Sequence, residues 1–217
     1  MTATPVTHDP ADVHHDDHDH PPPSHSSSRH PWGIIGIYTF IISEIALFGS
    51  FFMAYFIIRV IGAVDYAEWQ EAFAQAIPLE IALINTAILL SSSIWIWFAE
   101  RGFKQGNKRA LVFWLSMTIL FGSVFLGIQI YEYAELVTHK DIGPSSNAFS
   151  SVFFMITGLH GSHVLVGLIL LGMLLVRAVK GRYELGTHPP QGFMASVIYW
   201  HFVDVVWIVV LTTLYLL

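Results

Sequence analysis

Five side chains that titrate or bind metals lie inside apolar stretches of the sequence: Glu44, His160, His163, His201 and Asp204. His160 and His163 are three residues apart, which places both imidazoles on one side of a helix. Imidazoles bind haem iron and transition metals, and carboxylates within a membrane take part in proton transfer. The same groups also join helices by hydrogen bonds. The set therefore permits metal, haem, proton-transfer or purely structural chemistry.

The spacing of these residues favours the structural interpretation. A di-iron carboxylate bundle needs Glu-x-x-His motifs on two helices, and no apolar stretch contains one. Gly161 and Ser162 separate the two histidines and indicate close helix contact rather than room for a macrocycle. The sequence has no cysteine, which excludes thiolate-bound metals on this chain. We expect a buried polar cluster, with no catalytic residue, cofactor or metal on the chain; proton conduction through Glu44 is the alternative.

The composition shows what kind of element must position these residues. Hydrophobic residues make up 54% of the 217-residue chain and charged residues 12%, and the mean hydropathy is +0.57. A soluble domain would have too little polar surface at this composition, so the chain is expected to be an integral membrane protein. A net charge of -6 argues against nucleic-acid binding.

Five apolar runs are each long enough for a helix to cross the ~30 Å hydrocarbon core of a bilayer. They cover residues 34–60, 79–99, 110–131, 151–177 and 193–216. The predicted fold class is therefore all-α, a polytopic bundle of five transmembrane helices over residues 34–217. Glu44 lies roughly 15 Å along the first run, and the four other polar residues lie at similar depths in the fourth and fifth runs. We expect these three helices to meet around one polar cluster.

Basic residues concentrate in the second and fourth connections, which the positive-inside rule assigns to the cytoplasm. They are Arg101, Lys104, Lys108 and Arg109 in one, and Arg177, Lys180 and Arg182 in the other. This orientation predicts a cytoplasmic N-terminus and a C-terminus outside. Arg177, Lys180 and Arg182 are also candidates for contacts with anionic lipid head groups, the alternative being that they only set the orientation.

The first 33 residues differ in composition from the rest of the chain. They are rich in His, Asp, Pro and Ser and contain little to bury, which predicts a disordered cytoplasmic tail. The segment lacks the pattern of a signal peptide. Metal capture by the tail is a further hypothesis, for which the candidate ligands are His14, His15, His18, His20 and His25.

Several motifs resemble subunit III of the haem-copper respiratory oxidases over residues 32–217. The most specific are Thr157-Gly158-Leu159-His160-Gly161-Ser162-His163-Val164 and Tyr199-Trp200-His201-Phe202-Val203-Asp204-Val205-Val206-Trp207. Ile42-Ser43-Glu44 and the group of Gln129, Glu132 and Tyr133 add to the likeness. The length is similar to the short, five-helix bacterial form, which lacks the first two helices of the longer form.

The resemblance implies an accessory subunit in a hetero-oligomeric complex of the bacterial inner membrane. Haem and copper would belong to the partner subunits I and II, where oxygen is reduced to water and protons are pumped. This chain would pack mainly against subunit I, hold phospholipid, and sustain proton uptake over many turnovers.

The identity of the electron donor is predicted from finer features of the same motifs. The sequences around Glu44, Gln129 and Tyr199 favour cytochrome c, and a cytochrome bo-type quinol oxidase is the alternative. Two further alternatives are an independent proton channel or transporter and a haem or metal enzyme in its own right. A channel or transporter would need a polar lumen or a helix interrupted by Pro and Gly at mid-membrane depth, which the apolar runs lack.

Overall fold

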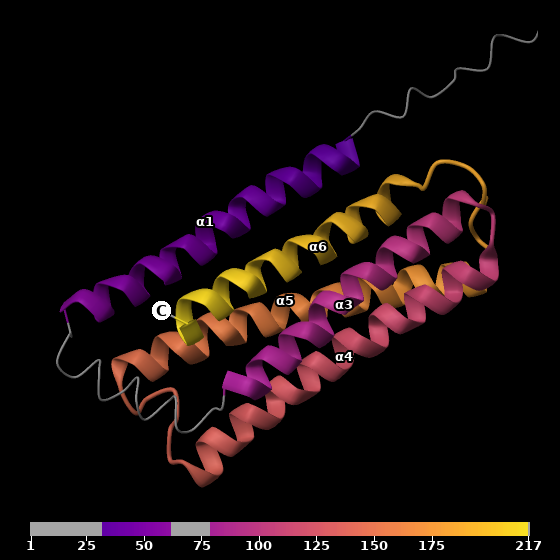
Figure 1. The fold of residues 1–217 in the computed structure, drawn as a ribbon. Helices are drawn as coiled ribbons and strands as arrows, with labels where there is room; N and C mark the ends of the chain where they lie inside the picture. Colours follow the sequence, from indigo (N-terminus) through magenta and orange to yellow (C-terminus); the bar gives the residue numbers. More distant parts are fainter. Residues whose placement is uncertain (1–31, 62–78, 217) are drawn as a thin grey trace, which may run out of the picture. The chain divides into compact units, whose positions relative to one another are not determined.

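The structure, a computed structural model, describes residues 32–61 and 79–216, and these residues form an all-helical bundle (Figure 1). The helices are α1 (Trp32–Ile61), α3 (Leu79–Lys104), α4 (Lys108–His139), α5 (Ala148–Val179) and α6 (Gln191–Leu211), and α6 continues into the π-helical turn η1 (Thr212–Leu216). Within these described ranges, five helices are long and apolar enough to cross a membrane. The predicted all-α fold with five spans is confirmed. The predicted tail of residues 1–33 lies outside the described residues, with its histidines, except for Trp32 and Gly33, which are the first two residues of α1 and not part of a tail.

The helices extend beyond the apolar runs that identified them. The largest difference is in α4, which continues to His139 although its apolar run ends near residue 131. Hydropathy reports only the part of a helix that lipid surrounds, whereas backbone hydrogen bonding continues into the polar boundary. The additional turns carry Glu132, Glu135 and His139.

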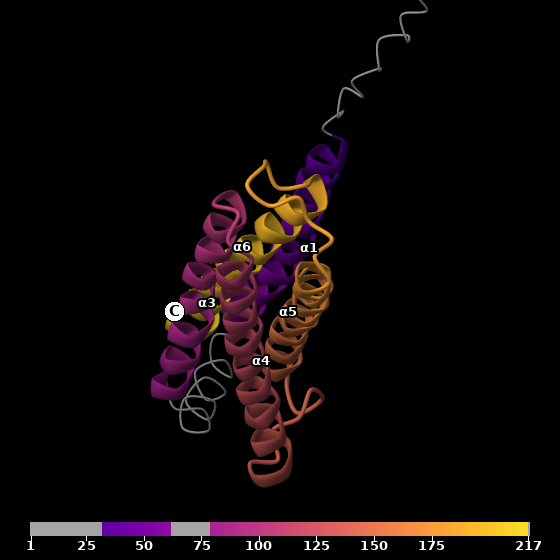
Figure 2. The ribbon, with the colours of Figure 1, turned by 90° about the vertical axis from the view of Figure 1, so that its right-hand side faces the viewer.

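Helix α6 is the centre of the bundle, because it packs against α1, α3 and α5 (Figures 1 and 2). In its most apolar stretch 61% of the residues are buried, against 11% in α1. Helix α1 packs mainly on α5 and α6, while α3 packs on α4 and α6. Side chains on α6 are thus the ones best placed to join helices that do not follow one another in the sequence.

Close packing around α6 depends on two glycines opposite one large ring. A Cβ atom added to Gly122 of α4 would lie 2.6 Å from the Trp200 ring, and one added to Gly167 of α5 would lie 2.8 Å from it. Trp200 is completely buried there, and its indole N–H donates to Ser92 of α3 at 2.9 Å. One side chain of α6 therefore contacts three neighbouring helices.

Small residues at four-residue spacing favour close helix packing, yet several of them lie on the surface of the described bundle. Ser50 of α1, Gly127 of α4 and Ser162 of α5 are all exposed. A Cβ atom added to Gly127 would meet nothing within 4 Å in the described structure. Single spacings of small residues do not reveal which face of a helix turns inward, and here the inward positions are Gly122 and Gly167.

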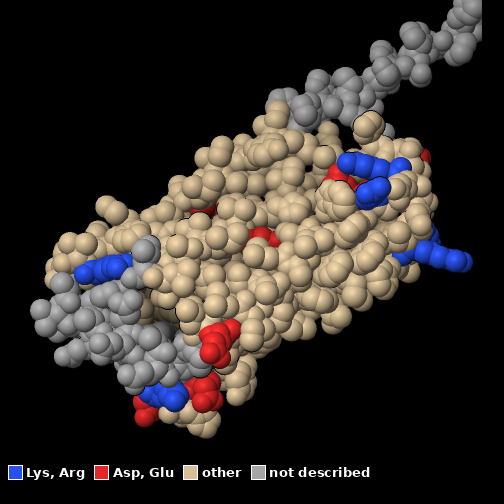
Figure 3. Space-filling view, viewed as in Figure 1, with Lys and Arg blue, Asp and Glu red and all other residues tan. Residues whose placement is uncertain are grey.

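The α3–α4 and α5–α6 connections meet at one end of the bundle. Gly106 and Gly186 both have positive φ angles, 74° and 82°, and a Cβ atom on Gly106 would lie 3.8 Å from Gly186. The amide of Gly186 also donates to the carbonyl of Phe103 at 3.0 Å. Lys and Arg gather at this end, on the right of Figure 3, while the surface between the two ends is almost entirely uncharged. This separation matches that of a membrane-spanning bundle.

Candidate functional site: polar contacts inside the helix bundle

Glu44 of α1 and His163 of α5 form a hydrogen-bonded pair. Oε2 of Glu44 lies 2.9 Å from Nε2 of His163, and the two side chains are 13% and 12% exposed. Nδ1 of His163 lies 2.8 Å from the carbonyl of Leu159, which only accepts, so Nδ1 carries a proton. The remaining proton then sits on either Glu44 or Nε2, and the pair is neutral overall in both cases. Neutrality reduces the cost of placing a carboxylate and an imidazole inside a membrane.

The Glu44–His163 pair joins three helices. The hydroxyl of Tyr199 on α6 donates to the backbone carbonyl of His163 at 3.1 Å. The Phe48 ring of α1 packs on the His163 ring with centroids 5.3 Å apart. Helix α1 has few buried side chains, and this pair is one of its polar links to the described bundle, beside the amide of Gly33, which donates to Gln191 of α6 at 3.1 Å.

His201 and Asp204 of α6 are linked through Ser93 of α3. The Ser93 hydroxyl lies 2.9 Å from Nδ1 of His201 and donates to Oδ2 of Asp204. Asp204 is 4% exposed, and its Oδ1 has no hydrogen-bond partner among the described residues. Side chains three residues apart on a helix can pair directly, and here Ser93 links the two.

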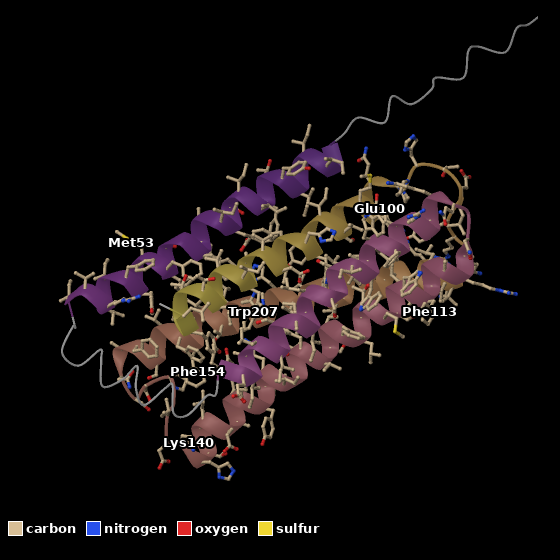
Figure 4. All side chains as sticks on the ribbon, viewed as in Figure 1. Met53, Glu100, Phe113, Lys140, Phe154 and Trp207 are labelled. Atoms are coloured by element: carbon tan, nitrogen blue, oxygen red, sulfur yellow. The ribbon has the colours of Figure 1, made fainter. Side chains whose placement is uncertain are left out.

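His160 occupies a third location, between α4 and α6. It is completely buried against the rings of Trp207 and Phe125, with centroids 5.0 Å and 5.9 Å away. Within the described ranges neither ring nitrogen has a hydrogen-bond partner. Trp207, labelled in the interior of the bundle in Figure 4, donates its indole N–H to Thr86 of α3 at 2.9 Å.

The five predicted residues therefore lie in three places rather than around one centre. His160 and His163 lie about 60° apart around the helix axis, and this is enough for His160 to contact rings of α4 and α6 while His163 bonds to Glu44 of α1. Each contact joins helices: α1 with α5, α3 with α6, and α4 with α5 and α6. In the described parts of the chain, no three His, Asp or Glu side chains come together in a group able to hold a metal ion.

Hydroxyl and amide side chains that the sequence did not single out complete these contacts. Ser92, Ser93 and Thr86 of α3 all bond to side chains of α6. Gln129, which the sequence indicated only as part of a motif, is 3% exposed and donates its amide N–H to the carbonyl of Thr157 at 2.9 Å. The run Ser91-Ser92-Ser93 inside an apolar helix was the available signal.

The candidate lipid-binding residues differ in their surroundings. Arg177 lines a groove of about 690 Å³ between α5 and the start of α6, whose walls are mostly apolar. Burial raises the pKa of the Tyr183 hydroxyl, and the positive charge of Arg177 partly offsets this effect. Lys180 and Arg182 are exposed beyond the end of α5. Of the three, Arg177 has an apolar groove beside it.

Comparison with known proteins identifies relatives along most of the chain. The sequence model of the family described as "Cytochrome c oxidase subunit III" matches residues 25–217. The cytochrome c oxidase subunit 3 of Thermostichus vulcanus is 36% identical, over 89% of this chain and 91% of the relative. That of Alkalihalophilus pseudofirmus is 36% identical over 84% of this chain and 85% of the relative. That of Drosophila melanogaster is 37% identical over 85% of this chain but 68% of the relative.

Proposed function

This chain belongs to the cytochrome c oxidase subunit III family, and on that premise we propose that it is the redox-inactive accessory subunit of a proton-pumping haem-copper oxidase. The complex reduces oxygen to water with electrons from cytochrome c. Haem and copper reside on the partner subunits I and II, and this chain stabilises subunit I and supports proton uptake. The names of the relatives favour cytochrome c over a quinol as the donor.

The observation that carries this proposal is the hydrogen bond between Glu44 and His163. The polar atoms of this pair are used in hydrogen bonds inside the bundle: the carboxylate of α1 bonds to the imidazole of α5, and the imidazole bonds to the carbonyl of Leu159 on its own helix. A redox or metal site would instead direct ligands toward a shared point. The pair is therefore consistent with a structural role, in which it keeps the helices of an accessory subunit in place beside a catalytic subunit.

Lipid binding belongs to the same proposal. The cationic Arg177 lies beside the apolar groove between α5 and α6, an arrangement that suits a phospholipid with its phosphate at the guanidinium and an acyl chain below. Lys180 and Arg182 add positive charge at the same end. Lipid held there would fill a hollow that side chains leave open.

The charge distribution supports a placement in the bacterial inner membrane with the α3–α4 and α5–α6 connections in the cytoplasm. The N-terminus then lies in the cytoplasm and the C-terminus outside. Five spans are consistent with this pair of locations.

Affinity purification through a tag on this chain tests the assignment. We expect subunits I and II to co-purify, with haem spectra and cytochrome c oxidase activity in the eluate. Once separated from them by detergent, the chain should show no Soret band and no stoichiometric copper or iron. Stoichiometric haem on the separated chain would overturn the proposal, and quinol-only activity would reassign the donor.

Replacing Glu44 with Gln tests the structural role of the pair. The amide keeps a hydrogen bond to His163 but cannot share a proton, so the initial turnover rate should be nearly unchanged. Loosening of α1 should shorten the catalytic lifetime, measured as the number of turnovers before activity falls by half. Complete loss of activity in a fully assembled complex would show that Glu44 takes part in the reaction itself.

A further inference from the structure

A groove of about 220 Å³ lies on the outer surface of the bundle between α4 and α5. It exists because the α5 side carries small residues: Gly158, Gly161 and Ser162. A Cβ atom added to Gly158 would find only the Tyr133 hydroxyl nearby, at 3.8 Å, among the described atoms. A second backbone can approach closely where side chains are this small.

An unpartnered polar atom lies on the floor of this groove. Gln129 of α4 is 3% exposed, and its amide N–H donates to Thr157, which directs Oε1 away from that carbonyl. A Cβ atom on Gly161 would lie 3.3 Å from Oε1, so this oxygen is beside the small residues of α5. Oε1 is buried and accepts no hydrogen bond from any described residue.

The chemistry of this oxygen restricts what fills the groove. A buried amide oxygen without a donor is costly in an apolar medium, because no water replaces the missing hydrogen bond. The acyl chain of a phospholipid carries no donor. A transmembrane helix with a hydroxyl or amide side chain supplies both the close-fitting surface and the donor.

We infer that this groove receives a transmembrane helix from another polypeptide of the oxidase, with a side-chain O–H or N–H of that helix donating to Oε1 of Gln129. The inference rests on the proposed function, which supplies such a polypeptide. It assigns the α4–α5 face, rather than the exposed face of α1, to the contact between subunits. Other exposed small residues, such as Gly36 and Gly49 of α1, have open space around them but no unpartnered buried polar atom beside them in the described structure.

A pair of matched substitutions tests the groove in the intact complex. Gly158→Leu fills the groove without a backbone clash, and Gly49→Leu places the same side chain on the open face of α1. We expect Gly158→Leu to lower the amount of subunit I that co-purifies with the tagged chain by about three- to tenfold, and Gly49→Leu to leave it unchanged. Equal retention in both variants, at wild-type level, would overturn the inference.

Photo-crosslinking identifies the occupant directly, because the chain has no cysteine of its own. Ser162→Cys at the groove and Ser50→Cys on α1 receive a short photoactivatable maleimide. The two serines are both exposed and lie at a similar depth, because the two spans run in opposite directions. Ser50 is 17 residues after Gly33, where its span begins, and Ser162 is 17 residues before Val179, where its span ends. After illumination of the purified complex, mass spectrometry identifies the partner of the tagged chain.

A crosslink from position 162 to another oxidase polypeptide supports the inference. A crosslink to lipid alone, or to a second copy of this chain, overturns it. The Ser50→Cys sample is the control, because it shows the crosslinks that a lipid-exposed position gives. Gln129→Leu should reduce the yield at position 162 severalfold while the melting temperature confirms a folded chain. If no oxidase polypeptide co-purifies with the wild-type chain, the proposed function fails instead, so the two failures are distinguishable.

Discussion

At the scale of single residues, the contacts between helices depend on hydroxyl groups that bond in two directions. The Ser93 hydroxyl contacts His201 and donates to Asp204, so one small side chain satisfies groups on a neighbouring helix. Asp204 is 4% exposed and has little access to water. Ser93 therefore contributes to the stability of the fold mainly because its loss would leave buried polar groups of α6 without a hydrogen-bond partner.

We expect Ser93→Ala to destabilise the folded chain by about 1–3 kcal/mol, because it removes the donor to a buried carboxyl group. Ser91→Ala is the control, since the Ser91 hydroxyl donates to the carbonyl of Ile88 on its own helix. Thermal unfolding of the purified complex measures both. Equal melting temperatures for the two variants would mean that Asp204 does not need Ser93.

At the scale of helices, the packing depends on the Trp200 ring between two glycines. Gly167→Ala brings a methyl group within 2.8 Å of the ring, which forces α5 and α6 apart or moves the ring. We expect a loss of about 1–3 kcal/mol in stability from this overpacking. Gly172→Ala, on the same helix with nothing within 4 Å in the described structure, should be neutral or slightly stabilising. Melting curves of the two variants make the comparison, and a similar loss in both would show that contact with the Trp200 ring is not the cause.

The sequence predicted helices better than it predicted contacts between them, for a physical reason. Hydropathy over about 20 residues identifies a span whatever its neighbours are, and all five spans were found in this way. The partner of a polar side chain depends on helix rotation, which hydropathy does not report. Glu44 and His163 were recognised by their depth, but Ser93 was not, because serines in helices commonly bond to their own backbone.

At the scale of the whole molecule, the two ends of the bundle differ in charge. The end with the α3–α4 and α5–α6 connections carries most of the Lys and Arg residues, whereas Arg59 and Lys140 are at the other end. This asymmetry orients the chain during insertion. The orientation can be tested by chemical labelling. The chain has no cysteine, so a cysteine introduced at either end would be the only site that a maleimide labels on this chain.

We expect Gln105→Cys, in the α3–α4 connection, to react with a membrane-impermeant maleimide only in inverted membrane vesicles. Ser145→Cys, in the α4–α5 connection, should react only in intact spheroplasts. Both positions are exposed, so their reactivity reports access rather than burial. The opposite labelling pattern would reverse the orientation proposed from the charges.

The peripheral position of α1 also affects how the protein is made. Helix α1 precedes the other described helices in synthesis, yet its main packing partners, α5 and α6, are the last two. During translation Glu44 enters the lipid long before His163 has left the ribosome. Until then the carboxyl group must stay protonated or be shielded by the insertion machinery, so the earliest stage of biogenesis is the one most exposed to error.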